Sequence, residues 1–228
     1  MKTALVTGAA RGIGRATAVA LAAAGVRVYA LDRDFPEPLP GVETLVHDLM
    51  DLGGLAPLVA SLGALDVLVN NAGVQPALPI DQYTDEARKR VLRVNLEAPV
   101  ELIRAASGPM KARRAGRIIN LTSVAAYGAH TDIWYAVTKA GIVSFTRSFA
   151  AALGPHGIQV NAVAPGPVDT ELMRNAQPER IAQLMKAVYT RRAGRPDEIA
   201  EAIRWLALDA PEILNGAVLD ITDGSFLR

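Results

Sequence analysis

Apolar residues in this chain gather into short runs rich in β-branched side chains, separated by longer stretches with helical periodicity. Most of the short runs are apolar at consecutive positions, which is typical of strands covered on both faces. They predict strands over 3–8, 26–32, 43–48, 65–73, 116–123, 158–166 and 217–224. The stretches between them predict helices over 12–24, 53–62, 84–112, 134–153 and 196–208. This alternation indicates an α/β fold with a parallel sheet, right-handed crossovers and helices on both faces.

One connection departs from the alternation. From Asp32 to Glu43 the chain reads DRDFPEPLPGVE, and three prolines in five positions do not fit a crossover helix. We therefore expect an extended loop there. Because no repeat, low-complexity tract or linker divides the 228 residues, we expect a single domain over 1–228.

Composition narrows the possible functions. Half of the residues are hydrophobic, which is enough for a sizeable core and argues against disorder. With 24 basic and 23 acidic residues, the charge balance gives no sign of a nucleic-acid or anionic-membrane partner. The absence of cysteine excludes disulfides, thiolate metal sites and a cysteine nucleophile. The three histidines show no metal-ligand spacing, so we expect no metal site.

The same sequence features give an expectation about location. The first strand pattern begins at residue 3 with no secretory signal before it. The apolar run ATAVALAAAGV is too short and too rich in alanine to span a bilayer. We expect a soluble cytoplasmic protein.

A glycine-rich turn follows the first predicted strand. In TGAARGIG, Thr7 to Gly14, glycines at 8, 12 and 14 allow the backbone to approach a pyrophosphate at a helix N-terminus. Such a turn can be an ordinary tight turn, but its place between a first strand and a helix favours dinucleotide binding.

Asp32 ends the second predicted strand, 24 residues after Gly8. A carboxylate at that place can accept hydrogen bonds from the adenosine ribose 2′-hydroxyl and repels a 2′-phosphate. Arg33 follows directly and weakens this discrimination. We expect NAD rather than NADP as the cofactor.

Tyr135 and Lys139 lie four positions apart in WYAVTKAG, so they share one face of the predicted helix. Taken alone, such a pair is most often a surface tyrosine whose ring covers a lysine stem. The other motifs of the chain change this interpretation.

Six motifs in order resemble the classical short-chain dehydrogenase/reductase family along essentially the whole chain. They are TGAARGIG, NNAG at 70–73, Asn95 in VNL, TS at 122–123, YAVTK at 135–139 and PGPVDT at 165–170. One such motif is common by chance, but six at the family's spacing are highly specific. The resemblance implies a Rossmann-type doubly wound fold with a seven-stranded parallel sheet of order 3-2-1-4-5-6-7.

The resemblance also implies the catalytic residues. Tyr135 would be the general acid/base that exchanges a proton with the substrate oxygen. Lys139, together with the positive charge of the oxidised nicotinamide, would lower the pKa of that phenol, and it would also hold the nicotinamide ribose hydroxyls. Ser123 would position the substrate oxygen, and Asn95 would hold a water that links Lys139 to solvent. Hydride transfer itself would belong to the nicotinamide.

Further cofactor-binding residues are carried over from matching positions. The glycine-rich turn contributes Gly8, Arg11, Gly12, Ile13 and Gly14. Asp48 with Leu49 would meet the adenine, and Asn71, Ala72 and Gly73 the adenosine ribose. Pro165, Gly166, Val168 and Thr170 would lie beside the nicotinamide carboxamide.

The sequence departs from the family pattern in the spacing of its serine. Ser123 lies 12 residues before Tyr135, whereas the family usually has 13. Either the intervening loop is one residue shorter, or Thr122 supplies the hydroxyl. The register of INLTS favours Ser123.

Several residues are candidates for the substrate side. His130, Asp132 and Trp134 suit recognition of a polar substrate, or an exposed turn with an aromatic lid. The segment 171–195 is expected to be a mobile cover. Its Arg191, Arg192 and Arg195 would suit an acidic substrate, although a solvated charge run is the better interpretation.

The sequence therefore predicts an NAD(H)-dependent alcohol dehydrogenase or ketone reductase, most simply of class EC 1.1.1. One alternative is oxidation of a cis-dihydrodiol to a catechol, because the crossover helix after the second strand is missing. Another is a dinucleotide-sensing regulator without turnover, which would need none of the catalytic set. The partner is a small-molecule substrate of unspecified identity. Surplus apolar residues on the helices over 84–112 and 134–153 and the family resemblance predict a homotetramer, with a dimer as the fallback.

Overall fold

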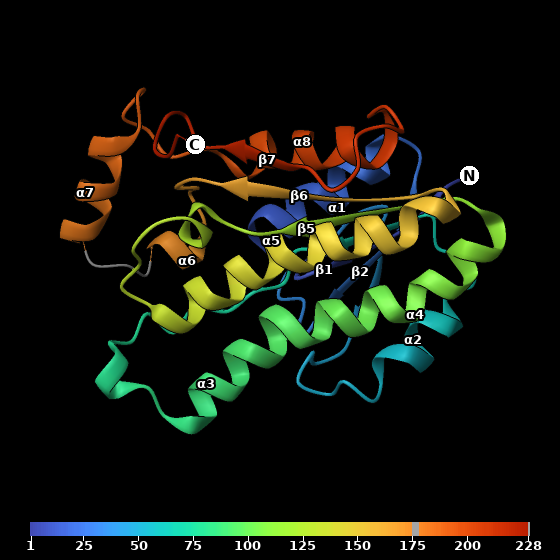
Figure 1. The fold of residues 1–228 in the computed structure, drawn as a ribbon, viewed down its shortest axis with the longest axis horizontal. Coiled ribbons are helices and arrows are strands. Elements are labelled where there is room, and N and C mark those ends of the chain that lie inside the picture. The colour runs from blue at the N-terminus through green and yellow to red at the C-terminus, as the bar shows by residue number, and fades with distance from the viewer. Residues whose placement is uncertain (175–177, 228) are drawn as a thin grey trace.

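The computed structural model describes residues 1–174 and 178–227 (Figure 1). The described strands form one parallel sheet in the order β3-β2-β1-β4-β5-β6-β7, as predicted. They are β1 (Thr3–Thr7), β2 (Arg27–Asp32), β3 (Glu43–Val46), β4 (Val67–Asn70), β5 (Gly116–Leu121), β6 (Ile158–Pro165) and β7 (Val218–Ile221). The helices are α1 (Gly12–Ala23), α2 (Leu55–Ser61), α3 (Asp85–Leu92), α4 (Ala98–Arg113), α5 (Ile133–Leu153), α6 (Glu171–Arg174), α7 (Pro178–Ala187) and α8 (Pro196–Leu208).

Strand order reverses at β1, which pairs with β2 on one side and β4 on the other. The chain first builds outward to β3 and then returns to add β4 beside β1. Connections leaving β1 and β4 thus diverge to opposite sides at the carboxyl edge of the sheet. In open α/β sheets such a switch point leaves a crevice for a ligand. The predicted cofactor residues lie along this edge.

The core has two layers, one on each face of the sheet (Figure 1). Helices α1 and α8 pack together on one face and bury Leu21 and Ile203 against Val6 of β1. Helices α2, α4 and α5 cover the other face, where Leu102 and Leu153 join the second cluster. Because both faces are covered, the central strands are apolar at consecutive positions, as their sequences indicated.

Three local features differ from or refine the expected elements. Residues 33–42 between β2 and β3 form no helix, in agreement with their prolines. The helix expected over 84–112 continues from α3 to α4 through a π-helical turn at Arg93–Glu97. The predicted cover over 171–195 contains two helices, α6 and α7, which the sequence did not predict. Residues 175–177 of that cover lie outside the described residues.

Candidate active site

Helix α5 begins at the carboxyl edge of the sheet because Asp132 caps it. The Asp132 carboxylate accepts a hydrogen bond from the Tyr135 backbone N–H at 3.0 Å, which satisfies one of the free donors of the first turn. One turn of helix then separates Tyr135 from Lys139. Both side chains face inward, with 9% and 3% of their surface exposed. Burial of both excludes the interpretation of a surface tyrosine that covers a lysine stem.

Lys139 is buried without an acidic partner among the described side chains. Its Nζ donates a hydrogen bond to the Leu121 carbonyl at 2.8 Å, at the end of β5. Burial disfavours the charged ammonium and lowers the pKa of Lys139 to about 8. A Cβ on Gly73 would lie 3.5 Å from Nζ, so the segment after β4 passes directly beside this amine.

Burial and one hydrogen bond act in opposite directions on the pKa of Tyr135. Burial raises the pKa of its phenol to about 12, and a hydrogen bond with Ser123 lowers it. The predicted lowering by Lys139 also requires the positive charge of the oxidised nicotinamide. The Lys139 Nζ lies 5.5 Å from the phenol ring centroid and donates to the Leu121 carbonyl. Burial therefore dominates, and the phenol of this chain is protonated at neutral pH.

The ambiguity between Ser123 and Thr122 is resolved by their contacts. The Thr122 hydroxyl is buried and donates to the Lys139 carbonyl at 2.7 Å, so it braces α5 against β5. The Ser123 hydroxyl faces the Tyr135 phenol and accepts from the Ala125 N–H at 3.2 Å. Neighbouring residues at the end of a strand point to opposite sides, so only Ser123 reaches the phenol.

Asn95 lies in the π-helical turn and is fully buried. Its Oδ1 accepts from the Val74 N–H at 2.8 Å, and its Nδ2 donates to the Val74 carbonyl at 2.9 Å. The same amide nitrogen contacts the Thr138 hydroxyl at 3.2 Å. Asn95 thus holds the segment after β4 against α5, beside Lys139. π-helical turns inside α-helices are frequent at functional sites.

The glycine-rich turn is closely packed. Gly8 and Gly12 adopt φ values of +65° and +54°, a region that favours glycine. A Cβ on Gly14 would lie 2.1 Å from the Gly8 carbonyl oxygen, so only glycine fits there. The Asn71 amide donates to the Thr7 and Gly8 carbonyls and ties the end of β4 to this turn.

The N-terminus of α1 is suited to an anion. Arg11 at its N-cap is extended, and no described side chain caps the helix or places an acid in its first turn. The first backbone N–H groups, including those of Gly12 and Ile13, therefore point out of the N-terminal end of the helix and have no side-chain acceptor. Free N–H groups and the helix dipole favour a phosphate here. These residues fit the pyrophosphate of a dinucleotide.

Asp32 lies at the end of β2, beside this turn. Its carboxylate accepts from the Ala10 N–H at 2.9 Å and from the Arg33 N–H at 2.8 Å, so its position is fixed by the backbone. One nearby cation, Arg11, is already paired. Arg11 contacts Asp34 and Glu171, at 3.3 and 3.5 Å.

The remaining predicted cofactor residues also follow strands at this edge. Asp48 and Leu49 follow β3, and the Asp48 carboxylate accepts from the Met50 N–H. Ala72 and Gly73 follow β4. Pro165 ends β6, and Gly166, Val168 and Thr170 continue from it across the crevice. A Cβ on Gly12 would lie 3.2 Å from the Thr170 methyl group, so the segment after β6 contacts the glycine-rich turn.

Comparison with known proteins identifies the family. A family model described as enoyl-(acyl carrier protein) reductase matches residues 8–225. This chain belongs to the short-chain dehydrogenase/reductase family. Galactitol 2-dehydrogenase of Agrobacterium fabrum is 35% identical over 99% of this chain and 98% of its own. The 3-oxoacyl-[acyl-carrier-protein] reductase of Escherichia coli is 34% identical over the same shares.

A solved structure gives the same result. It is described as a putative NAD(P)-dependent gluconate 5-dehydrogenase from Beutenbergia cavernae and contains NADP at low occupancy. It superposes with a TM-score of 0.91 at 33% identity, over 98% of this chain and 96% of its own. The family membership makes this short-chain dehydrogenase/reductase an oxidoreductase that uses a nicotinamide dinucleotide.

The sequence did not reveal the full role of Asp132. Its carboxylate is completely buried and also accepts from the Ala77 N–H at 2.9 Å and the Tyr83 hydroxyl at 2.7 Å. It therefore ties the segment after β4 to the start of α5. An aspartate three positions before a helical tyrosine is a recognisable N-cap signal. The partners Ala77 and Tyr83 lie about fifty residues away in sequence and had no such signal.

Trp134, another predicted substrate-side residue, turns toward α3. The Arg88 guanidinium lies 5.8 Å from its ring centroid, in a cation–π contact. Trp134 therefore packs against α3 of this short-chain dehydrogenase/reductase and is half-buried.

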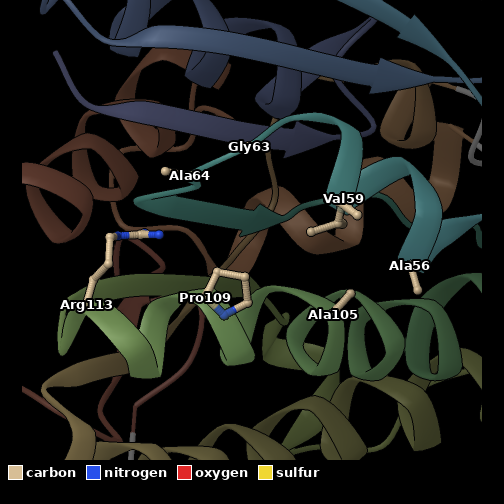
Figure 2. A pocket seen from close by; sticks show the side chains of 8 residues that line it. Ala56, Val59, Gly63, Ala64, Ala105, Pro109 and Arg113 are labelled. Carbon is tan, nitrogen blue, oxygen red and sulfur yellow. The ribbon is translucent and has the colours of Figure 1, made fainter.

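A separate cavity of about 450 Å³ lies between α2 and α4, away from Tyr135 (Figure 2). Its lining is mainly alanine with Val59 and Pro109, and Arg113 at one end donates to the Leu65 carbonyl. Across residues 1–174 and 178–227, no three acidic or histidine side chains are placed to hold a metal ion. None of the described helices is both long and apolar enough to cross a bilayer.

Proposed function

We propose that this chain interconverts a secondary alcohol and a ketone with NAD(H), and that Tyr135 is its general acid/base. The supporting observation is the contact of the Ser123 and Tyr135 hydroxyls beside buried Lys139. These groups lie at the sheet edge where the glycine-rich turn opens. A substrate oxygen that accepts from both hydroxyls would lie at the centre of this group.

Each side chain has a separate task in this proposal. Ser123 holds the substrate oxygen, and Tyr135 gives a proton to it in reduction or removes one in oxidation. The bound nicotinamide supplies or accepts the hydride. Lys139 holds the ribose hydroxyls of the cofactor, and its ammonium favours the phenolate that oxidation requires. Asn95 braces Val74 and α5 and, with a water, would connect Lys139 to solvent.

The NAD preference rests on charges beside Asp32. A 2′-phosphate at the end of β2 would meet the Asp32 carboxylate, whose position two backbone N–H groups maintain. Arg11 already neutralises Asp34 and Glu171, and Arg15 pairs with Glu37 at 3.6 Å. Arg33 is the exposed cation that remains beside this position.

The two alternatives have less support from the geometry. The dihydrodiol hypothesis came from the missing helix between β2 and β3, but Phe35 and Leu39 of that loop pack with the α1 cluster. The loop lies on the adenosine side, so it does not inform the substrate. A dinucleotide-sensing regulator would not require Ser123, Tyr135 and Lys139 to come together.

A fluorescence assay of the reduced cofactor tests the proposal. We expect turnover on at least one class among sugars, hydroxy acids, steroids and dihydrodiols, with either ketone reduction or alcohol oxidation. Tyr135→Phe removes one hydroxyl and should lower kcat by ~10²–10⁴-fold, the usual contribution of a general acid/base. Its dissociation constant for the cofactor should stay within about twofold.

Tyr189→Phe is the matched control, because this tyrosine is exposed and should keep wild-type turnover. Retention of more than a tenth of wild-type activity by Tyr135→Phe would assign the proton transfer to another residue. Cofactor binding without turnover across the whole panel would favour the regulator.

A further inference from the structure

A basic side chain from the cover reaches the substrate side of Tyr135. Arg180 of α7 donates to His130 Nε2 at 3.0 Å and to the Thr131 hydroxyl. The His130 ring centroid lies 5.4 Å from that of Tyr135. The His130 side chain therefore lies between the Arg180 guanidinium and Tyr135, the proposed general acid/base.

Both side chains that accept hydrogen bonds from Arg180 are neutral. His130 Nδ1 lies 3.1 Å from both the Asp132 N–H and the Asp132 carbonyl. Because Nε2 accepts from Arg180, the matching neutral tautomer carries its proton on Nδ1 and donates to the Asp132 carbonyl. Burial and the neighbouring Arg180 charge lower the pKa of His130, which keeps the ring neutral at pH 7. A guanidinium carries a permanent charge and five N–H donors, of which these contacts use two.

The neighbouring carboxylates do not neutralise this charge by direct contact. The Asp132 carboxylate makes the local electrostatic potential more negative. It already accepts hydrogen bonds from the Ala77 and Tyr135 N–H groups and from the Tyr83 hydroxyl. Glu179 is exposed and adjacent in sequence. Within the described part of the chain, neither forms an ion pair with Arg180.

The other arginines of the cover have different roles. Arg192 pairs with Glu198 at 2.7 Å, and Arg195 pairs with Asp197 at 3.1 Å. Arg191 donates to the carbonyls of Met185 and Lys186. The basic run in the sequence is thus used to hold the start of α8 and the end of α7, and it does not face the substrate.

We propose that Arg180, with the Thr131 hydroxyl and His130 beside it, binds an anionic group of the substrate, most simply a carboxylate. The proposal rests on the proposed function and narrows it to hydroxy acids and oxo acids. The planar fork of a guanidinium matches the two oxygens of a carboxylate. A phosphate monoester presents the same oxygens, so both anions belong in the test.

The decisive measurement is kcat/KM for matched substrates. Secondary hydroxy acids of increasing chain length are compared with their primary amides and with the corresponding phosphate monoesters. We expect the wild type to prefer the best acid over its amide by about tenfold or more, the scale of a charge-assisted hydrogen bond. Arg180→Gln should reduce this preference to about twofold, with the larger loss in kcat/KM for the acid.

Two variants separate charge from position. Arg180→Lys keeps the charge but loses the fork, so it should give an intermediate preference. Arg191→Gln removes the same charge from the same cover and should keep the wild-type preference. A wild type that turns over amides as well as acids would overturn the anion site and leave the proposed function standing. A preference for phosphate monoesters would support the site and assign phosphate as its ligand.

A binding measurement separates this inference from the proposed function. Succinate should raise the thermal midpoint of the wild type with its cofactor, and Arg180→Gln should lose most of that shift while Arg191→Gln keeps it. Stabilisation that depends on Arg180 would support the site even if no substrate is turned over. Equal shifts in wild type and Arg180→Gln would contradict it.

Discussion

At the scale of single residues, the two buried ionisable groups of α5 determine how stability changes with pH. Lys139 has a pKa of about 8 in the folded chain, against 10.5 for a free lysine. Between these values the unfolded chain binds a proton that the folded chain does not, so stability rises with pH. Tyr135 has a pKa of about 12 in the folded chain, against 10.0 for a free tyrosine. Between these two values the folded chain keeps a proton that the unfolded chain has lost, so the contribution of Tyr135 to stability falls as pH rises.

Lys139→Met should therefore change the pH profile of unfolding. From pH 8 to 10.5, the wild type should gain free energy of unfolding relative to the variant, by on the order of 3 kcal/mol at most. The variant keeps an apolar stem and has no buried ammonium. Denaturant titrations at half-unit pH steps measure this, with exposed Lys111→Met as control. Parallel profiles for wild type and Lys139→Met would show that Lys139 is not perturbed.

A second residue-scale prediction concerns cofactor choice. Unit charges ~4 Å apart at an effective dielectric of ~20 interact by about 4 kcal/mol, an upper guide for a partly exposed site. A third of that energy is already a tenfold preference, so the wild type should favour NAD over NADP at least tenfold in kcat/KM. Asp32→Ser should erase most of this preference.

Glu43→Gln is the matched control for Asp32→Ser. It removes the same charge from the neighbouring strand at the opposite, amino edge of the sheet, where Glu43 pairs with Arg27. Its cofactor preference should equal that of the wild type. A wild type that prefers NADP would mean that Arg33 or Arg11 outweighs Asp32.

At the scale of elements, Asp132 connects α5 to the segment after β4. Asp132→Ala removes an N-cap, worth ~0.5–2 kcal/mol, and it also removes the carboxylate that accepts from the Ala77 N–H and from the hydroxyl of half-buried Tyr83. A hydrogen bond to a charged group contributes at most ~1.5–3 kcal/mol. We expect a loss of about 3 kcal/mol in the free energy of unfolding, together with reduced turnover. Urea unfolding and kcat measure the two effects.

Thr84→Ala is the matched comparison, because Thr84 caps α3 through one exposed hydrogen bond to the Ala87 N–H. It should cost only about 1 kcal/mol. If the two substitutions cost the same, Asp132 would act as an ordinary cap and not as a connection between segments.

At the scale of the whole molecule, we propose a homotetramer, with a dimer as the fallback. The apolar residues that suggested it are buried or half-buried within one chain: Val91, Leu92, Val94, Leu96, Val100, Leu102, Ile142, Val143, Phe145 and Phe149. Among them Leu92, Leu96, Val100, Phe145 and Phe149 are only half-buried, so they leave apolar surface for a contact. Ile133 and Val137 on α5, which are 45% and 47% exposed, also support the proposal.

Val137→Glu should therefore shift the assembly toward smaller species, because a charge would enter the proposed contact. Light scattering at micromolar concentration measures the mass of wild type and variant. Val19→Glu, at a similarly exposed valine of α1, should leave the mass unchanged. A monomeric wild type would contradict the proposal.

Patterns in the amino-acid sequence predicted the strands and the main helices, and the family resemblance predicted the order of the sheet. Consecutive apolar positions mark strands covered on both faces, and the motifs follow the ends of those strands in order. The sequence also indicated the glycine-rich turn, Asp32, Tyr135 and Lys139, because each belongs to a local pattern of fixed spacing. The proline-rich loop between β2 and β3 was predictable for the same reason.

The contacts of the folded chain were needed to show which hydroxyl meets Tyr135, what Asp132 holds, and which arginine of the cover lies beside His130. Thr122 and Ser123 differ in direction, and direction at a strand end depends on the helix that packs there. Arg180 has no distinguishing sequence pattern, and its partners lie about fifty residues away. Such pairings depend on burial and on contacts between distant segments, which residue spacing along one element does not encode.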